Sequence, residues 1–188
     1  PMDDRWNFHA GGGQFKTLKI FTSALENRYG VAKDLQDYAM KSQLMAYEGQ
    51  RAMFEGFAAN RFQSSGVIQW MLNNAWPSMI WHLYDYYLMP AGGYFATKTA
   101  CEPVHAQYSY HDKSIVIVNT TQQEQKGLKL TIAVYDLASQ EKFSQTINVD
   151  VPAESNVKAA VLPSIKDLSA TFFMRLTLED RKQIVSRN

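Results

Sequence analysis

The sequence has little cysteine and almost no charge imbalance, and each deficit excludes a class of protein. Cys101 is the only cysteine among 188 residues, so the chain can form no internal disulfide and no cysteine-rich zinc site. The 19 Lys and Arg nearly cancel the 18 Asp and Glu. No large electrostatic field therefore exists to attract nucleic acid or a charged membrane surface. We predict neither of these partners, and we expect Cys101 to be a small buried residue.

Long apolar runs and a secretion signal are also missing. No apolar stretch approaches the roughly 20 residues that a membrane-spanning helix needs. The chain opens in Pro-Met-Asp-Asp without a signal peptide, but this opening need not be the natural N-terminus, so the missing signal leaves the compartment undecided. What the chain does have is 46% hydrophobic, 13% aromatic and 20% charged residues. This composition predicts a packed core rather than a disordered chain.

The first part of the chain has the three- and four-residue periodicity of helices. One helix is predicted from Phe15 to Tyr29, where Tyr29-Gly30 provides a stop. A second helix, beginning near Ala32, carries a broad apolar stripe. Gly49 and Gly56 each weaken this helix by about 1 kcal/mol relative to Ala. We therefore expect a neighbouring element to approach it closely at both glycines.

A buried strand is predicted after this helix. The run at 67–72, Val-Ile-Gln-Trp-Met-Leu, is short, apolar and β-branched at its start, which is typical of a strand buried on both faces. A loop follows through Trp76-Pro77, and a short helix is predicted from about Tyr94 to Cys101. Helix, buried strand, loop and helix in this order are typical of the end of an α/β barrel.

After Pro103 the apolar residues alternate with a period of two. Six strands are predicted, at residues 105–110, 114–118, 128–135, 142–149, 155–162 and 171–179. Short strands at regular spacing with polar turns between them indicate an immunoglobulin-like β-sandwich. The predicted fold class is α+β by content. Residues 1–102 form a partial (β/α)8 barrel segment with helices and the last strand, and residues 103–188 form the sandwich.

Three tryptophans, Trp70, Trp76 and Trp81, lie within a dozen positions on the predicted strand and its loop. Aromatic side chains of this size usually fill a core. Barrel enzymes, however, build their sites from the loops at the C-terminal ends of the strands, and Asn73 and Asn74 lie where they could hydrogen-bond sugar hydroxyls. A sugar-binding site and plain core packing are equally good interpretations at this point.

The acidic residues do not form a convincing catalytic pair. Glycosidases need two carboxyl groups about 5 to 9.5 Å apart across the scissile bond. Glu48 and Glu55 lie two turns apart on one helix with Arg51 between them, so an ion-paired structural helix is the better interpretation. Asp85, within Leu-Tyr-Asp-Tyr-Tyr, is the one acid among aromatics. It is either a hydrogen-bonded strut or a ligand to a sugar hydroxyl or amine, and the strut is favoured.

The histidines show no metal-ligand spacing. His82, His105 and His111 lack a pattern such as His-Glu-x-x-His, and we interpret them as structural. His9 lies in an aromatic lead-in, Trp-Asn-Phe-His, and could line a pocket. The sequence therefore predicts no metal site.

One segment resembles a known family. The run at 66–78, Gly-Val-Ile-Gln-Trp-Met-Leu-Asn-Asn-Ala-Trp-Pro-Ser, is similar to the last barrel strand of glycoside hydrolase family 2, in the branch of exo-β-D-glucosaminidases and β-mannosidases. Upstream, Tyr47-Glu48 and residues 51–55 resemble the helix before that strand. Downstream, residues 84–88, 102–105 and the closing Val-Ser-Arg-Asn resemble the passage into the next domain and parts of that immunoglobulin-like domain.

This resemblance implies that the chain is a piece of a retaining exo-β-glycosidase that acts on non-reducing-end sugars of oligo- or polysaccharides. In the family both catalytic carboxylates would lie upstream of Pro1, so the piece alone would be inactive. The resemblance suggests a periplasmic or secreted location and implies no cofactor. It does not decide between glucosamine and mannose. An amino sugar could use the carboxylate of Asp85 or the aromatic face of Trp76.

The resemblance also implies which residues touch the sugar. Trp70 would end the eighth strand as the floor of the subsite for the non-reducing sugar, with a non-proline cis peptide between it and Met71. Asn73, Asn74 and Trp76 would border the same pocket. Trp6-x-x-His9 is similar to a family segment just past the nucleophile strand, which would place Trp6 and His9 at the pocket rim.

The resemblance also predicts that the sandwich is incomplete. In the family a Tyr-Trp-Leu strand follows Ser-Arg-Asn, so we expect the sandwich to lack its last strand and to leave a sheet edge open. Exposed core surface would then favour self-association. The alternative is a non-catalytic immunoglobulin-like module that binds carbohydrate or serves a structural role, although such a module would not need a tryptophan-ended strand and its flanking helices.

Overall fold

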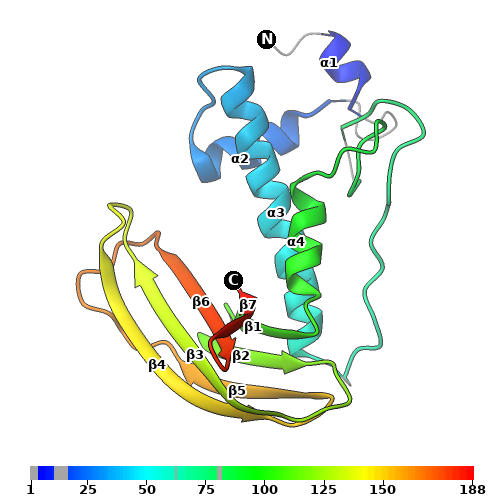
Figure 1. The fold of residues 1–188 in the computed structure, drawn as a ribbon. Coiled ribbons are helices and arrows are strands. Elements are labelled where there is room, and N and C mark those ends of the chain that lie inside the picture. The colour runs from blue at the N-terminus through cyan, green and yellow to red at the C-terminus, as the bar shows by residue number, and fades with distance from the viewer. Residues whose placement is uncertain (1–3, 11–16, 62, 80–81) are drawn as a thin grey trace. The chain divides into compact units, whose positions relative to one another are not determined.

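The computed structural model describes residues 4–10, 17–61, 63–79 and 82–188. The chain divides into two compact units (Figure 1). The first comprises Pro1–Met53 and Gly66–Lys98, and the second comprises Phe54–Ser65 and Thr99–Asn188. Among the described helices, none combines the length and apolar character that crossing a membrane requires.

The first unit is helical. It contains α1 (Asp4–Phe8), α2 (Lys19–Tyr29), most of α3 (Leu35–Ala59) and α4 (Gly92–Ala100). The predicted stop after Tyr29 is confirmed, because Gly30 has φ 77° and its N–H caps Glu26 O. The helix α3 begins a few residues later than predicted, where Asp34 Oδ1 accepts the N–H of Asp37 at 2.8 Å in the geometry of an N-cap.

Close packing in this unit occurs at Gly92 and Gly93 rather than at the pair of glycines predicted. A Cβ added to Gly49 or Gly56 would meet no atom within 4 Å, so the prediction of close approach there is wrong. The tight contact is made by Gly92, at the start of α4, whose added Cβ would clash with the backbone of Gln43 in α3. The Gly92 N–H also donates to Gln43 Oε1 at 2.6 Å.

The predicted buried strand at residues 67–72 does not form. Ile68 is 89% exposed and Trp70 is 69% exposed. A strand exists only by pairing with a neighbour, and no described residue pairs with the backbone of 67–71 in a ladder. The first contact of this kind is an isolated bridge between Asn73 and Tyr84. The peptide bond between Trp70 and Met71 is cis, as the family resemblance predicted.

The second unit contains the β-sandwich, and all six predicted strands are present (Figure 1). One sheet has the order β1-β2-β5 and the other the order β4-β3-β6-β7. The strands are β1 (Val104–Tyr108), β2 (Ser114–Asn119), β3 (Gln125–Tyr135), β4 (Glu141–Val151), β5 (Ser155–Val161), β6 (Phe173–Asp180) and β7 (Gln183–Arg187). The strand β7 was not predicted. It pairs with β6 in antiparallel register, Leu178 opposite Ser186.

The alternation of apolar residues explains the sandwich core. In β3, Leu128, Leu130, Ile132 and Val134 are all buried, as expected for side chains that point to one face of a strand. They pack against residues from both sheets: Val104, Ala106, Ile115, Ile117, Val151, Leu162, Leu176 and Leu178. Burial of this many aliphatic side chains is the main stabilising contribution to the unit.

The end of helix α3 belongs to this second unit. The last carbonyls of a helix have no partner within the helix, and here the sandwich supplies donors for them. Gln107 Nε2 donates to Glu55 O at 2.7 Å. Asn156 Nδ2 donates to Ala58 O at 2.8 Å and to Ala59 O at 3.1 Å. Side chains of β1 and β5 therefore cap the C-terminal turn of α3.

Candidate functional site

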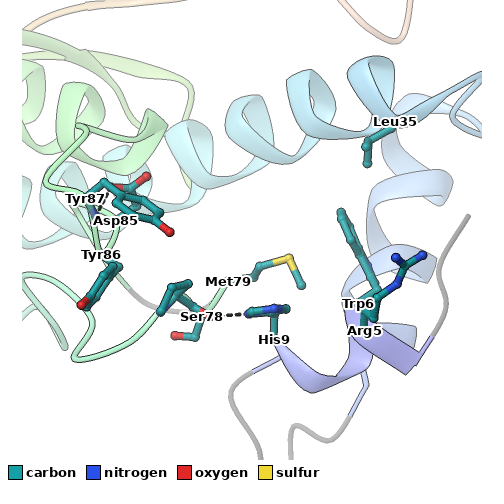
Figure 2. Close-up of a pocket in the computed structure, with 10 residues that line it drawn as sticks. Arg5, Trp6, His9, Leu35, Ser78, Met79, Asp85, Tyr86 and Tyr87 are labelled. Atoms are coloured by element: carbon teal, nitrogen blue, oxygen red, sulfur yellow. Dashed lines mark hydrogen bonds between the residues drawn. The ribbon is translucent and has the colours of Figure 1, made fainter.

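The first unit contains a cavity of about 440 Å³ (Figure 2). The helix α1 contributes Arg5 and Trp6 to its lining, and His9 follows in the next turn. The loop after Trp76 contributes Ser78 and Met79, and a second loop contributes Asp85, Tyr86 and Tyr87. Aromatic walls with a few polar groups are typical of a small-molecule site.

His9 is held at the cavity by the loop that it faces. Its Nδ1 lies 2.5 Å from Pro77 O, and its own carbonyl accepts the N–H of Met79 at 2.9 Å. Because a carbonyl oxygen only accepts, Nδ1 must carry the proton of this bond. In the neutral ring Nε2 is therefore an acceptor, available to a ligand hydroxyl or amine.

Trp76 supports this histidine rather than lining the cavity. The two rings are stacked, with centroids 5.6 Å apart and planes inclined by 29°. Phe8 packs edge-on against the same indole at 5.3 Å. Such aromatic contacts favour one orientation of the imidazole. Trp76 thus fixes the direction in which His9 offers its Nε2.

Asn74 is a structural strut of the same loop. Its side chain is buried, and its Nδ2 donates to Ser78 O at 3.2 Å and lies 2.5 Å from His82 Nδ1. Its neighbour Asn73 is exposed, with Nδ2 at 3.5 Å from Asn74 O. Neither asparagine lines the cavity. Trp70 does not line it either, and Trp81 lies outside the described residues.

Asp85 is a strut of its own turn and also lies at the cavity. Its Oδ1 accepts the N–H of Tyr87 at 2.8 Å and that of Met89 at 2.9 Å, which makes it the strut of a tight turn. The half-buried residue also lines the cavity. Among the described residues, none donates a hydrogen bond to its other carboxylate oxygen, Oδ2.

The glutamates of α3 hold the fold together. Glu48 forms an ion pair with Arg28 at 2.7 Å and accepts a hydrogen bond from Tyr29. This arrangement raises the pKa of the Arg28 guanidinium, chiefly through its bond to Tyr29. Glu55 is 4% exposed, and its Oε1 lies 3.0 Å from His105 Nε2 and 2.6 Å from Asn188 Nδ2.

His105 is the centre of a buried polar cluster in the second unit. Its Nδ1 lies 3.1 Å from both Ser186 Oγ and Glu102 Oε2. The cluster joins α3, β1 and β7, so the structural interpretation of this histidine is consistent with its surroundings. Among the described residues no group of three possible metal ligands comes together. Asp85 is the one carboxylate that lines the cavity in this part of the chain.

The structure therefore brings His9 and Asp85 to one cavity, with Trp76 behind His9. Sequence reasoning did not predict Arg5, Tyr86 and Tyr87 as lining residues, although the Tyr-Asp-Tyr-Tyr run was a signal for the last two. The prediction that Cys101 is buried is wrong. It follows the last residue of α4 and is exposed.

Comparisons with known proteins point to one group of enzymes. Residues 112–188 match the family model described as Mannosidase Ig/CBM-like domain. An exo-β-D-glucosaminidase of Hypocrea jecorina is 38% identical over 200 residues, which cover 100% of this chain and 22% of that protein. The corresponding enzyme of Amycolatopsis orientalis is 39% identical over 93% of this chain and 18% of its own length.

Solved structures agree with these relatives. The exo-chitosanase CsxA of Amycolatopsis orientalis, in complex with PNP-β-D-glucosamine, matches with a TM-score of 0.90 and 38% identity over 96% of this chain and 22% of that chain. A β-D-mannosidase of Dictyoglomus thermophilum, 20% identical, shares the fold with a TM-score of 0.82 over 96% of this chain and 22% of its own. The chain thus spans about a fifth of the length of the relatives that it matches.

Proposed function

Because the chain belongs to the exo-β-D-glucosaminidase and β-mannosidase branch of glycoside hydrolase family 2, we propose that it is part of a longer retaining exo-β-glycosidase. In this proposal residues 1–102 are the last part of a catalytic (β/α)8 barrel, and residues 103–188 are the immunoglobulin-like domain that follows it. The similarity of the whole chain to structures of such enzymes supports this division.

The observation that carries the proposal is the cavity of the first unit. It offers aromatic faces, the imidazole of His9 and the carboxylate of Asp85 within one small volume. Sugars present both apolar C–H faces and hydroxyl groups, so they need this combination of flat aromatic rings and a few polar acceptors. We propose that the cavity forms part of the subsite for the non-reducing sugar.

The tryptophan and asparagine residues extend this subsite in the proposal. The indole of Trp70 is open to stacking at its cis peptide with Met71. Asn73 is exposed beside it, and Asn74 and Trp76 hold the loop that carries Ser78. In the proposal Trp70 is the floor of the subsite, and the other three residues border it.

We propose that the chemistry itself depends on carboxylates outside this chain. A retaining mechanism requires two carboxyl groups about 5 to 5.5 Å apart, and Asp85 alone lines the cavity among the described residues. We propose that the acid/base and the nucleophile precede this chain in the whole protein and that the chain alone is inactive.

Hydrolysis of aryl β-glycosides tests the proposal. The whole protein and this chain would be assayed side by side on aryl β-glucosaminide, β-mannoside and β-galactoside. Turnover by the whole protein alone is the expected result, and the preferred sugar would identify the activity. Turnover by this chain would contradict the missing carboxylates. No turnover by either would favour a non-catalytic carbohydrate-binding or structural module.

We also propose that the chain self-associates when it is separated from the rest of the protein. Ile68, Trp70 and Leu72 are consecutive alternate residues with more than half of each side chain exposed. Contiguous apolar surface of this kind drives association in water. Light scattering of the purified chain over a concentration series would give a mass that rises with concentration. A constant monomer mass would contradict this proposal.

A further inference from the structure

We propose that the carboxylate of Asp85 is the determinant that makes the subsite prefer an amino sugar over a neutral sugar. In this proposal Oδ2 accepts hydrogen bonds from the ammonium group of the sugar. The inference rests on the proposed function, because it assumes that the cavity holds the non-reducing sugar.

The turn around Asp85 uses only one of the two carboxylate oxygens. Oδ1 is occupied by the N–H groups of Tyr87 and Met89, and the turn is closed further by the bond from the Asp85 N–H to Met89 O at 3.0 Å. The side chain is therefore fixed by its own backbone. Oδ2 receives no hydrogen bond from the described residues, so one acceptor of a fixed carboxylate is left for a ligand.

The surroundings of Asp85 suit a cation. Tyr86 and Tyr87 follow it directly in the lining of the cavity, and aromatic faces attract ammonium groups through their electron-rich centres. His9, whose Nδ1 is bonded to Pro77 O, turns its other ring nitrogen, Nε2, away from that bond. The one cationic side chain that lines the cavity among the described residues, Arg5, is drawn in Figure 2 at the end opposite Asp85, beside Trp6 and Leu35.

A neutral sugar would gain less from the same group. A hydroxyl can donate one hydrogen bond to Oδ2 in which only the carboxylate is charged, whereas an ammonium donates a bond in which both partners are charged. The ammonium therefore adds the attraction between two opposite charges to the hydrogen bond. The carboxylate should therefore change the ratio between two substrates, while a purely structural residue would change both rates together.

The substitution Asp85→Asn isolates the charge. Asparagine keeps an Oδ1 that can accept the N–H groups of Tyr87 and Met89, so the turn is preserved while the negative charge is lost. The matched control is Asp34→Asn. Asp34 also accepts a backbone N–H, that of Asp37, but it does not line the cavity.

Steady-state kinetics of the whole protein decides the proposal. For Asp85→Asn we expect kcat/KM on an aryl β-glucosaminide to fall about 10- to 100-fold, because a bond to a charged group is lost. We expect kcat/KM on an aryl β-mannoside to change less than about 3-fold. Asp34→Asn should leave both unchanged. An equal loss on both sugars, at an unchanged melting temperature, would overturn the inference and leave the proposed function intact.

The wild-type whole protein provides a second test that needs no variant. We expect it to hydrolyse the glucosaminide at least about 10-fold faster than the mannoside, in terms of kcat/KM. A ratio near one, or a preference for mannose, would overturn the role of Asp85 while confirming a glycosidase. Failure to hydrolyse any of the sugars would contradict the proposed function itself.

Discussion

The two units of the chain differ in how completely they bury their side chains. In the sandwich unit, buried polar side chains such as Glu55, His105 and Ser186 are bonded to one another, and the aliphatic core is closed. In the helical unit most of the large apolar side chains among the described residues remain exposed, including Ile68 and Trp70. A segment can have the apolar composition of a core and still expose its side chains, because burial requires other residues to pack against them.

The largest effect that tests this contrast is expected at Glu55. Replacing Glu55 with Ala leaves the buried His105 and the half-buried Asn188 without the Glu55 carboxylate. Removing the partner of a buried hydrogen-bonding group costs about 1–3 kcal/mol for each group left behind. The free energy of unfolding of the chain, measured by urea denaturation with circular dichroism, should fall by that amount. Glu55→Gln keeps the oxygen and should cost less.

The control for Glu55 is the other glutamate of the same helix. Glu48 pairs with Arg28, whose side chain is 59% exposed, and exposed pairs contribute about 0–1 kcal/mol. Glu48→Ala should therefore have a small effect. If both alanine variants lost the same free energy of unfolding, the buried cluster would not be a principal contributor to the stability of the sandwich unit.

A second prediction makes the same substitution in both units. Leu130 is fully buried in the sandwich, whereas Leu72 is 64% exposed in the helical unit. Leu130→Ala removes buried methyl groups and leaves a cavity, which costs about 2–5 kcal/mol, whereas an exposed substitution stays within about 0.5 kcal/mol.

Urea denaturation of the two leucine variants would check this prediction. A loss for Leu72→Ala that approaches the loss for Leu130→Ala would show that residues 67–72 are buried in solution, as expected for the strand that the sequence predicted. The same pair of variants in the whole protein would sharpen the comparison. There the proposed barrel would cover Leu72, and the two losses should become more nearly equal.

The sandwich was predictable because its signals are local. Alternation along β3 is enough to identify the face that Leu128, Leu130 and Ile132 bury, whatever the rest of the chain does. The strand β7 escaped prediction because its hairpin turn consists of Arg181 and Lys182, with φ of 45° and 73°. Two-residue hairpin turns with positive φ usually contain Gly or Asn, and neither is present in this turn.

The helical unit was less predictable because its arrangement depends on distant residues. The run at 67–72 has the composition of a buried strand, yet strand formation requires partners that sequence patterns cannot supply. The same limit applies to the candidate site. His9 and Asp85 could each be suspected from aromatic neighbours, but only the fold brings them to one cavity. The bonds that hold Asp85 Oδ1 in a turn follow from backbone geometry that composition does not encode.

The smallest expected effect concerns a surface carboxylate of the sandwich. Asp112 lies in the turn between β1 and β2. It accepts a bond from Lys158 Nζ at 2.8 Å and two bonds from Ser114, through Oγ at 2.6 Å and the backbone N–H at 3.1 Å. These bonds, that of Lys158 first, hold the pKa of the Asp112 carboxyl well below its usual range. An aspartate in an unfolded chain titrates near pH 4.

The sign of the pH dependence follows from this difference between the two states. Because the carboxyl of Asp112 has a lower pKa in the folded chain than in the unfolded chain, it contributes its full stabilisation above about pH 4. That contribution is lost as the pH falls from there toward the folded pKa. Melting temperatures of the wild type and of Asp112→Asn, measured between about pH 6 and pH 2, should therefore converge at the acid end. Curves that stay parallel down to pH 2 would show that the Lys158 and Ser114 bonds do not stabilise the ionised form, and that this turn is held by its backbone alone.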